Sequence, residues 1–344
     1  MISKPGKAAI AIAAILVVIV VSGCVSTPPI NDGNGTKGKE VPVLKIGYLP
    51  ITHALLPLIV YAEGNTTNFK LEMVRFSSWP DMAEAIQSGS IDGGGSILNT
   101  LAIKLASKDI PLKAVLMAVR DGSVLVVSKE IGEVSELKGK TIAIPSKFSP
   151  HYILLDQYLT DNNLELGTDV KTIELAPPDM ISALAGKTID GYIVAEPFGV
   201  KAEEMGIGRV LVLSKDIEIP GSHSNECVIA INQSFTSKYP EAVQEFVERL
   251  IKAGEFAEAH PEEAAKLVAP YLGQKPETIV HALTDPPGRS GYLDLYPRES
   301  EYGAFQDYML KMGLLDKKID IKEFVDESFA ENAYKKLGEE ITAK

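Results

Sequence analysis

Ser149, Pro150 and His151 are consecutive residues whose types suit the binding of a small anion. Ser149 can cap a helix and Pro150 suits the first helical position, so the pair predicts a helix that begins here. The unpaired N–H groups of a first helical turn attract anions, and His151 would lie in that turn. An ordinary strand-to-helix connection with a solvated histidine is the alternative for this stretch.

The surrounding pattern predicts elements that would hold these residues in place. An apolar alternating run at residues 141–144 ends at Pro145, before the polar loop, and a helical pattern follows the loop. In open α/β sheets, ligands lie beyond the carboxyl ends of the strands, where helix N-termini converge. This rule nominates the loops that follow the other predicted strands as well. The candidate solute-binding residues are Thr52, His53, Ser78, Trp79, Gly95, Ser96, Arg120, Lys147, Ser149, His151 and Glu196.

These residue types favour a small oxyanion as the ligand. Hydroxyl groups, backbone donors and histidines donate hydrogen bonds, and Arg120 and Lys147 supply positive charge. Some candidates have a second interpretation. Trp79 forms either a pocket wall or plain core. Arg120 either binds the anion or pairs with Asp121. We interpret Glu196 as a partner of His151, with a turn residue as the alternative.

No catalytic motif is recognisable in the sequence. There is no nucleophile elbow, no HExxH motif and no phosphate loop, and the remaining histidines lack metal-ligand spacing. We therefore expect a binding protein rather than an enzyme, with no cofactor and no metal.

An internal repeat indicates two similar halves. Residues 85–93 and 183–191 both read Ala, Ile or Leu, any residue, Ser or Gly, any residue, Ser or Thr, Ile, Asp, Gly. The aspartate follows a strand-ending proline at nearly the same spacing in each half. Two α/β lobes with parallel internal plans are the simplest explanation, and chance similarity is the alternative. The three glycines at residues 93–95 are expected to form a tight turn, with a helix at 97–106.

Composition and charge restrict the class of protein. The 344 residues, 45% hydrophobic and 23% charged, fit two domains of ordinary size. A formal charge of −12 argues against nucleic acid as a partner, because phosphates would be repelled.

The N-terminus predicts export. Lys4 and Lys7 precede an apolar run at residues 8–21, which is typical of a secretion signal. Residues 21–24, Val-Ser-Gly-Cys, resemble the lipobox of prokaryotic lipoproteins, which implies that Cys24 is a lipid anchor; an uncleaved membrane anchor is the alternative. Cys227 is then the one cysteine of the mature sequence, so no internal disulfide is expected, and we interpret Cys227 as a small core residue.

The predicted organisation has five parts, with a hinge of two crossings near residues 127–129 and 222–226. Helices are expected at 240–259, 261–272, 276–283, 299–312 and 321–337, and they would pack on the first lobe. The parts are a signal peptide (1–23), a lipid-anchored flexible tether (24–42), the first lobe (43–127), the second lobe (128–223), and a return to the first lobe with a C-terminal helical extension (224–344).

Several stretches carry a family resemblance. Residues 149–152 and the two leucines at 154–155 look like the Ser-Thr-His-Asn plus leucine segment of nitrate and bicarbonate binders. Residues 176–180 and 190–198 are similar to the Pro-Pro and Asp-Gly to Glu-Pro-Trp segments of the same group, with Phe198 where a tryptophan is usual. The chain thus resembles solute-binding proteins of ABC importers, in the branch with nitrate, bicarbonate, sulfonate, taurine and thiamin pyrimidine-precursor binders.

The resemblance implies a two-lobed type II periplasmic-binding-protein fold and an anion-binding role for His151. It also implies a monomer outside the cytoplasm that delivers a small solute to an ABC permease and its ATPase. The alternatives are a binding protein for a pyrimidine or another aromatic thiamin precursor, walled by Trp79, Phe148 and Tyr152, and an enzyme like the thiamin-pyrimidine synthases.

Overall fold

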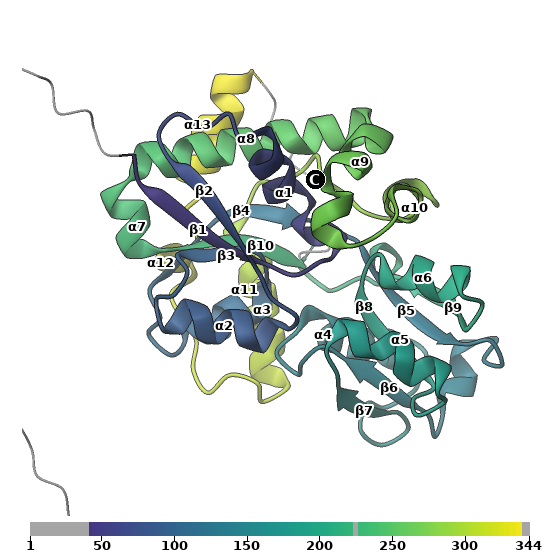
Figure 1. Cartoon of the computed structure of the whole chain (residues 1–344). Helices are drawn as coiled ribbons and strands as arrows, with labels where there is room; N and C mark the ends of the chain where they lie inside the picture. Colours follow the sequence, from purple (N-terminus) through teal and green to yellow (C-terminus); the bar gives the residue numbers. More distant parts are fainter. Residues whose placement is uncertain (1–40, 223–225, 339–344) are drawn as a thin grey trace, which may run out of the picture. The chain divides into compact units, whose positions relative to one another are not determined.

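The computed structural model describes residues 41–222 and 226–338, which contain two separate five-stranded sheets with helices around each (Figure 1). The predicted signal peptide, the lipid-anchor residue Cys24 and most of the tether lie outside the described residues. The elements of the first lobe are β1 (Val43–Tyr48), η1 (Thr52–Ala54), α1 (Leu55–Glu63), β2 (Lys70–Arg75), α2 (Trp79–Gln87), β3 (Gly93–Leu98), α3 (Asn99–Ala106), β4 (Leu112–Val119), β10 (Cys227–Asn232), α7 (Gln233–Lys238), α8 (Pro240–Ala259) and α9 (Pro261–Leu272).

The second lobe and the C-terminal segment complete the described chain. The elements of the second lobe are β5 (Ser123–Ser128), η2 (Val134–Leu137), β6 (Thr141–Ile144), α4 (Pro150–Asp161), β7 (Lys171–Glu174), α5 (Pro177–Ala185), β8 (Gly191–Ala195), α6 (Phe198–Glu204), β9 (Gly208–Leu213) and η3 (Ser214–Asp216). The C-terminal segment contains α10 (Pro276–Thr284), α11 (Glu299–Lys311), α12 (Ile321–Phe324) and α13 (Ser328–Leu337).

The two sheets have the same plan. Their strand orders are β2-β1-β3-β10-β4 and β7-β6-β8-β5-β9. In each sheet the second and third strands of this order, β1 and β3 or β6 and β8, are parallel. The fourth strand, β10 or β5, runs antiparallel to the third. This arrangement confirms the prediction of an α/β protein with two lobes.

The repeated Ile-Asp-Gly motif performs the same task in both lobes. Asp92 N donates to Lys45 O, and its Oδ2 accepts from Lys45 N, both at 2.8 Å. Asp190 N donates to Thr141 O, and its Oδ2 accepts from Thr141 N, both at 2.9 Å. Each aspartate therefore fixes the start of one central strand, β3 or β8, against its parallel neighbour, β1 or β6.

The tight turn expected at residues 93–95 is wrong, because these glycines belong to the buried strand β3. A Cβ on Gly93 would lie 2.2 Å from Ala230 O on the antiparallel neighbour β10. Gly191 of β8 is in the same position, where a Cβ would lie 2.5 Å from Val126 O. The glycines permit close approach of two backbones, which explains why the repeat includes them. Helix α3 accordingly begins after the strand, later than expected.

The boundary predicted between residues 127 and 128 is also wrong. Strand β5 pairs with β8 and β9 of the second lobe, so the chain leaves the first lobe at residues 120–122. An apolar strand pattern does not identify its pairing partner, and β4 and β5 are separated by too few residues for the sequence to show the change of sheet. The chain has returned to the first lobe at β10; of the second predicted crossing, residues 223–225 lie outside the described residues.

The C-terminal helices agree with the sequence pattern except for the last one. The helix expected at 321–337 is divided into α12 and α13, because Val325 forms a bridge with Ala114 and Asp326 N donates to Ala114 O at 2.9 Å. The break covers part of the exposed edge of β4. Helix α13 packs against α8 (Figure 1), so this part of the extension lies on the first lobe as predicted.

Candidate functional site

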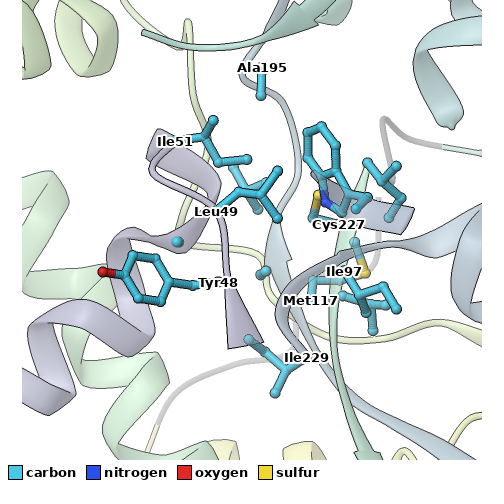
Figure 2. Close-up of a cluster of buried hydrophobic side chains, with 14 of the residues drawn as sticks. Tyr48, Leu49, Ile51, Ile97, Met117, Ala195, Cys227 and Ile229 are labelled. Carbon is cyan, nitrogen blue, oxygen red and sulfur yellow. The ribbon is translucent and has the colours of Figure 1, made fainter. Parts of the chain in front are cut away.

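His53 and Cys227 lie together in the core of the first lobe. Both are fully buried, and His53 Nδ1 is 3.1 Å from Cys227 Sγ. Figure 2 shows Cys227 in an apolar cluster with Ile97, Met117 and Ile229. Burial raises the pKa of the thiol well above its ordinary value, so Cys227 keeps its proton and can donate it to Nδ1. The ring hydrogen of His53 is then on Nε2.

His53 is a neutral donor that lies beside the backbone of Gly122, which partly opposes the lowering of its pKa. Burial lowers the pKa of its imidazole to about 4, so the ring is uncharged at neutral pH. Its Nε2 has no hydrogen-bond partner in the described structure. The nearest carboxylate oxygen that pairs with it, Glu226 Oε2, is 3.7 Å away, which is longer than a hydrogen bond.

Ser123 joins His151 of the second lobe to Glu226. Ser123 Oγ donates to Glu226 Oε2 and lies 2.8 Å from His151 Nε2. Because a hydroxyl has one proton, Ser123 Oγ accepts from His151 Nε2–H when Glu226 is ionised, and His151 Nδ1 is then an acceptor. His151 Nδ1 and Glu226 Oε1 are buried without a hydrogen-bond partner.

Burial also controls the charges of this pair. The pKa of His151 is well below its ordinary value because of burial and the nearby His53. The pKa of Glu226 is raised to about 8, mainly by burial and partly by Asp121, while the hydroxyls of Ser123 and Ser214 oppose the shift. The side chains of His53, His151 and Glu226 together are therefore close to electrically neutral at neutral pH when no solute is bound.

Trp79 brings a residue of β3 to the same place. Its indole Nε1 donates to Ser96 O at 3.0 Å, and its ring centroid is 5.9 Å from that of His151. Trp79 and Ser96 are fully buried, and Ser96 Oγ has no hydrogen-bond partner. We call His53, Ser96, Ser123, His151 and Glu226 the interlobe polar cluster.

The interlobe polar cluster has an unusual concentration of polar atoms without protein partners. Buried polar groups are nearly always hydrogen-bonded, and each unsatisfied group costs about 1–3 kcal/mol. The four atoms in this cluster are His53 Nε2, Ser96 Oγ, His151 Nδ1 and Glu226 Oε1. His53 Nε2 and Ser96 Oγ can donate hydrogen bonds, and His151 Nδ1 and Glu226 Oε1 can accept them. Together these atoms can satisfy a small polar solute.

Ser123 and Glu226 were not among the residues predicted from the sequence. Ser123 begins β5 directly after the first crossing, and Glu226 directly precedes β10 at the second one. The sequence signal for both residues was a polar side chain beside a hinge crossing. The first crossing, however, was predicted at residues 127–129, later in the chain than Ser123.

Thr52 and Glu196 form a direct contact between the lobes. Thr52 N and Oγ1 both donate to Glu196 O, at 2.9 and 3.1 Å. Apolar residues meet nearby, since Leu49 and Ile51 belong to the same cluster as Ala195 in Figure 2.

The interpretation of Glu196 as a partner of His151 is wrong. The buried Glu196 carboxylate accepts from Arg289 Nε at 2.7 Å and also binds the Nη2 of this arginine. It further accepts from the N–H groups of Gly199 and Val200, in the first turn of α6. Burial raises the pKa of Glu196, whereas the charge of Arg289 and the N–H groups of Gly199 and Val200 oppose this shift and favour the carboxylate.

Arg120 is bound to the C-terminal segment. Its Nη1 lies 2.5 Å from Glu301 Oε2, and its Nε and Nη2 donate to the carbonyl oxygens of Asp294 and Tyr296, both at 2.6 Å. These contacts replace the anion-binding role expected for Arg120 with a structural one. Lys147 is exposed, and its backbone N donates to Glu174 Oε1.

The remaining candidates have local structural contacts. Ser149 caps α4 by accepting from Tyr152 N at 3.3 Å, so this helix begins as the sequence predicts. Ser78 caps α2 by accepting from Asp81 N at 3.3 Å. Gly95 lies within β3, where a Cβ would be 2.8 Å from Ile46 Cγ2.

In residues 41–222 and 226–338, no group of three or more His, Cys, Asp or Glu side chains is placed to hold a metal ion. Within the same ranges, no helix has the length and apolar character needed to cross a membrane.

Comparison with known proteins identifies the relatives of the chain. A family model described as the NMT1-like family matches residues 37–272. The nitrate import ATP-binding protein NrtC of Synechocystis is 26% identical over 274 residues, which cover 72% of this chain and 40% of that protein. The chain thus spans about two fifths of that relative. A putative aliphatic sulfonates-binding protein of Bacillus subtilis is 25% identical over 337 residues, 93% of this chain and 95% of that protein.

A solved structure shares the fold. The ligand-binding component of an ABC-type import system from Staphylococcus aureus, solved with zinc bound, has a TM-score of 0.76 and 28% identity. The match covers 85% of this chain and 99% of that chain.

Proposed function

Because the chain belongs to the NMT1-like family, we propose that it is the extracytoplasmic solute-binding component of an ABC importer. Its solute is a small oxyanion of the nitrate, bicarbonate, sulfonate or taurine class. The proposal is consistent with the names of the relatives, which include a nitrate import protein and a putative sulfonates-binding protein.

The observation that carries the proposal is the interlobe polar cluster. His53 and Ser96 come from the first lobe, His151 and Ser123 come from the second, and Glu226 lies at a crossing. The polar atoms without protein partners are buried where the lobes meet. A solute bound there would bridge both lobes and supply the missing hydrogen bonds.

Hinge closure is the mechanism that this position supports. The solute binds more tightly to the closed form, in which both lobes contact it, and so shifts the open-to-closed equilibrium. Thr52 and Glu196 form a contact between the lobes that belongs to the closed form. The closed protein would then dock on a membrane permease driven by a cytoplasmic ATPase, as a monomer.

The location follows from the N-terminal sequence. Cys24 would be lipidated after removal of residues 1–23, and the tether would hold the two lobes near the outer face of the cell membrane. This part of the proposal concerns residues outside the described structure.

A neutral aromatic solute is the second candidate within the binding class. The observation that favours it is the buried Trp79 ring beside His151. A pyrimidine could stack on this indole and use the two acceptors of the interlobe polar cluster. The aromatic wall proposed with Phe148 has less support, because the ammonium of Lys104 lies 5.1 Å from the centre of the Phe148 ring.

Calorimetric titration of the full chain in detergent tests the proposal. The solutes are nitrate, bicarbonate, taurine, alkanesulfonates and hydroxymethylpyrimidine. We expect an oxyanion to bind most tightly and His151→Ala to weaken it by at least tenfold, while His281→Ala, a variant outside the interlobe polar cluster, has no effect. Tightest binding of the pyrimidine would replace the oxyanion with the aromatic candidate. Indifference of the tightest solute to His151→Ala would refute the site.

A further inference from the structure

We propose that Glu226 makes the site selective for solutes that carry a hydrogen-bond donor in addition to their anionic oxygens. This inference rests on the proposed function and narrows its class of solute. The expected solutes are an aminosulfonate, in which an ammonium accompanies the sulfonate, or an oxyanion that retains an O–H group. Nitrate and simple alkanesulfonates lack such a donor.

The Glu226 side chain is buried with one of its two oxygens unpartnered. It is 1% exposed, and its Oε2 accepts from Ser123 while its Oε1 has no partner. Within residues 41–222 and 226–338, no lysine or arginine forms an ion pair with it, and the neutral His53 ring lies 3.7 Å from its Oε2. Burial raises the pKa of Glu226 to about 8, so the acid keeps its proton when no solute is bound, and an ammonium group beside Oε1 would favour the ionised form.

A second acceptor belongs to the same hydrogen-bonded chain. Ser123 links Glu226 to His151. When a solute ammonium favours the ionised form of Glu226, the single proton of Ser123 is used on that carboxylate, which leaves His151 Nδ1 with a free lone pair. An oxyanion without hydrogens has no donor for either acceptor of this ionised arrangement. It would also be repelled by an ionised Glu226.

Donors from the first lobe occur in the same cluster. His53 Nε2 and Ser96 Oγ belong to the first lobe, and neither has a hydrogen-bond partner there. These groups suit the anionic oxygens of a solute, whereas Glu226 and His151 suit its donor. A solute with both kinds of group satisfies all four atoms, and a bare oxyanion satisfies two.

The other titratable groups near Glu226 do not change this conclusion. Asp121 adds negative charge and makes an ionised Glu226 less favourable without a cationic partner. His53 and His151 are held neutral by burial and provide no permanent positive charge. An ammonium group from the solute would supply the positive charge that the cluster lacks.

Two pairs of matched solutes test the inference by calorimetry on the full chain in detergent. Taurine and propane-1-sulfonate have similar size and the same sulfonate, but only taurine has an ammonium. Bicarbonate and nitrate are both planar trigonal anions, but only bicarbonate has an O–H group. Since a hydrogen bond to a charged group contributes about 1.5–3 kcal/mol, we expect a preference of roughly 10- to 100-fold for the donor-bearing member of at least one pair.

The variant Glu226→Gln should reduce this preference at least tenfold, because it removes the negative charge with little change in shape. Glu130→Gln is the matched control, because it makes the same change at an exposed carboxylate outside the interlobe polar cluster, and it should retain the preference. A thermal unfolding transition confirms that each variant is folded. The selectivity of the unaltered protein tests the inference even if a variant does not fold.

The outcomes separate this inference from the proposed function. No preference in either pair, or a preference that survives Glu226→Gln, overturns the role of Glu226 while oxyanion binding stands. Failure of all four anions to bind overturns the proposed oxyanion function together with this inference.

Discussion

Replacement of Arg289 by glutamine should strongly destabilise the protein. Arg289 and Glu196 form a buried ion pair, with side chains 3% and 0% exposed, between the C-terminal segment and the second lobe. The variant leaves the Glu196 carboxylate with two backbone N–H donors but no cation. Loss of one partner of a buried pair costs about 3–5 kcal/mol, which is the decrease expected in the free energy of unfolding. Urea titration of the full chain in detergent measures it.

Two comparisons make this prediction specific. Lys318→Gln removes an exposed ion pair with Asp307, whose side chains are 65% and 62% exposed, and should cost no more than about 1 kcal/mol. The double variant Glu196→Gln/Arg289→Gln removes both buried charges and should recover part of the loss. A change below about 1 kcal/mol for Arg289→Gln would refute the reasoning that this pair is buried and holds the segment to the second lobe.

Three other perturbations have defined outcomes. Gly93→Ala should destabilise the protein by about 1–3 kcal/mol or more, because the added Cβ would lie 2.2 Å from Ala230 O, whereas Gly303→Ala, with no atom within 4 Å, should stabilise α11 by about 0.5–1 kcal/mol; urea titration compares them. The pKa of Glu226 is raised from 4.5 to about 8, so its contribution to stability is complete below pH 4.5 and is lost as the pH rises through 8; stability measured across this range should decline less in Glu226→Gln, and an identical decline would contradict the shift. Cys24→Ser should release the protein from membranes in a fractionation assay, whereas unchanged retention would favour an uncleaved anchor.

Local signals in the sequence predicted the local features well. The start of α4 follows from Ser149 and Pro150, because a cap and a first-turn proline act within a few residues. The repeated Asp-Gly motif predicted two similar lobes, because each aspartate binds the backbone of its own lobe. Such features depend on residue type and short-range spacing, both of which are visible in the chain.

Long-range partners were the part that the sequence did not reveal. Arg120 was assigned to the anion site because its positive charge suits an anion, and Glu196 was interpreted as a partner of His151. Their actual partners, Glu301 and Arg289, lie far along the chain. Strand β5 has an apolar pattern that fits either sheet, and pairing with Gly191 of β8 decides its lobe. Residue type and periodicity do not specify which distant segments meet.

The central claim is that a solute is captured at the interlobe polar cluster. Nitrogen NMR of the imidazole rings tests it most directly, because ring nitrogen signals respond to changes in hydrogen bonding and tautomer. The full chain, labelled at histidine, is titrated with taurine and bicarbonate. The account predicts that a saturating solute shifts the signals of His53 and His151 and leaves those of His260 and His281 unchanged. Saturation that leaves the His53 and His151 signals in place would contradict it.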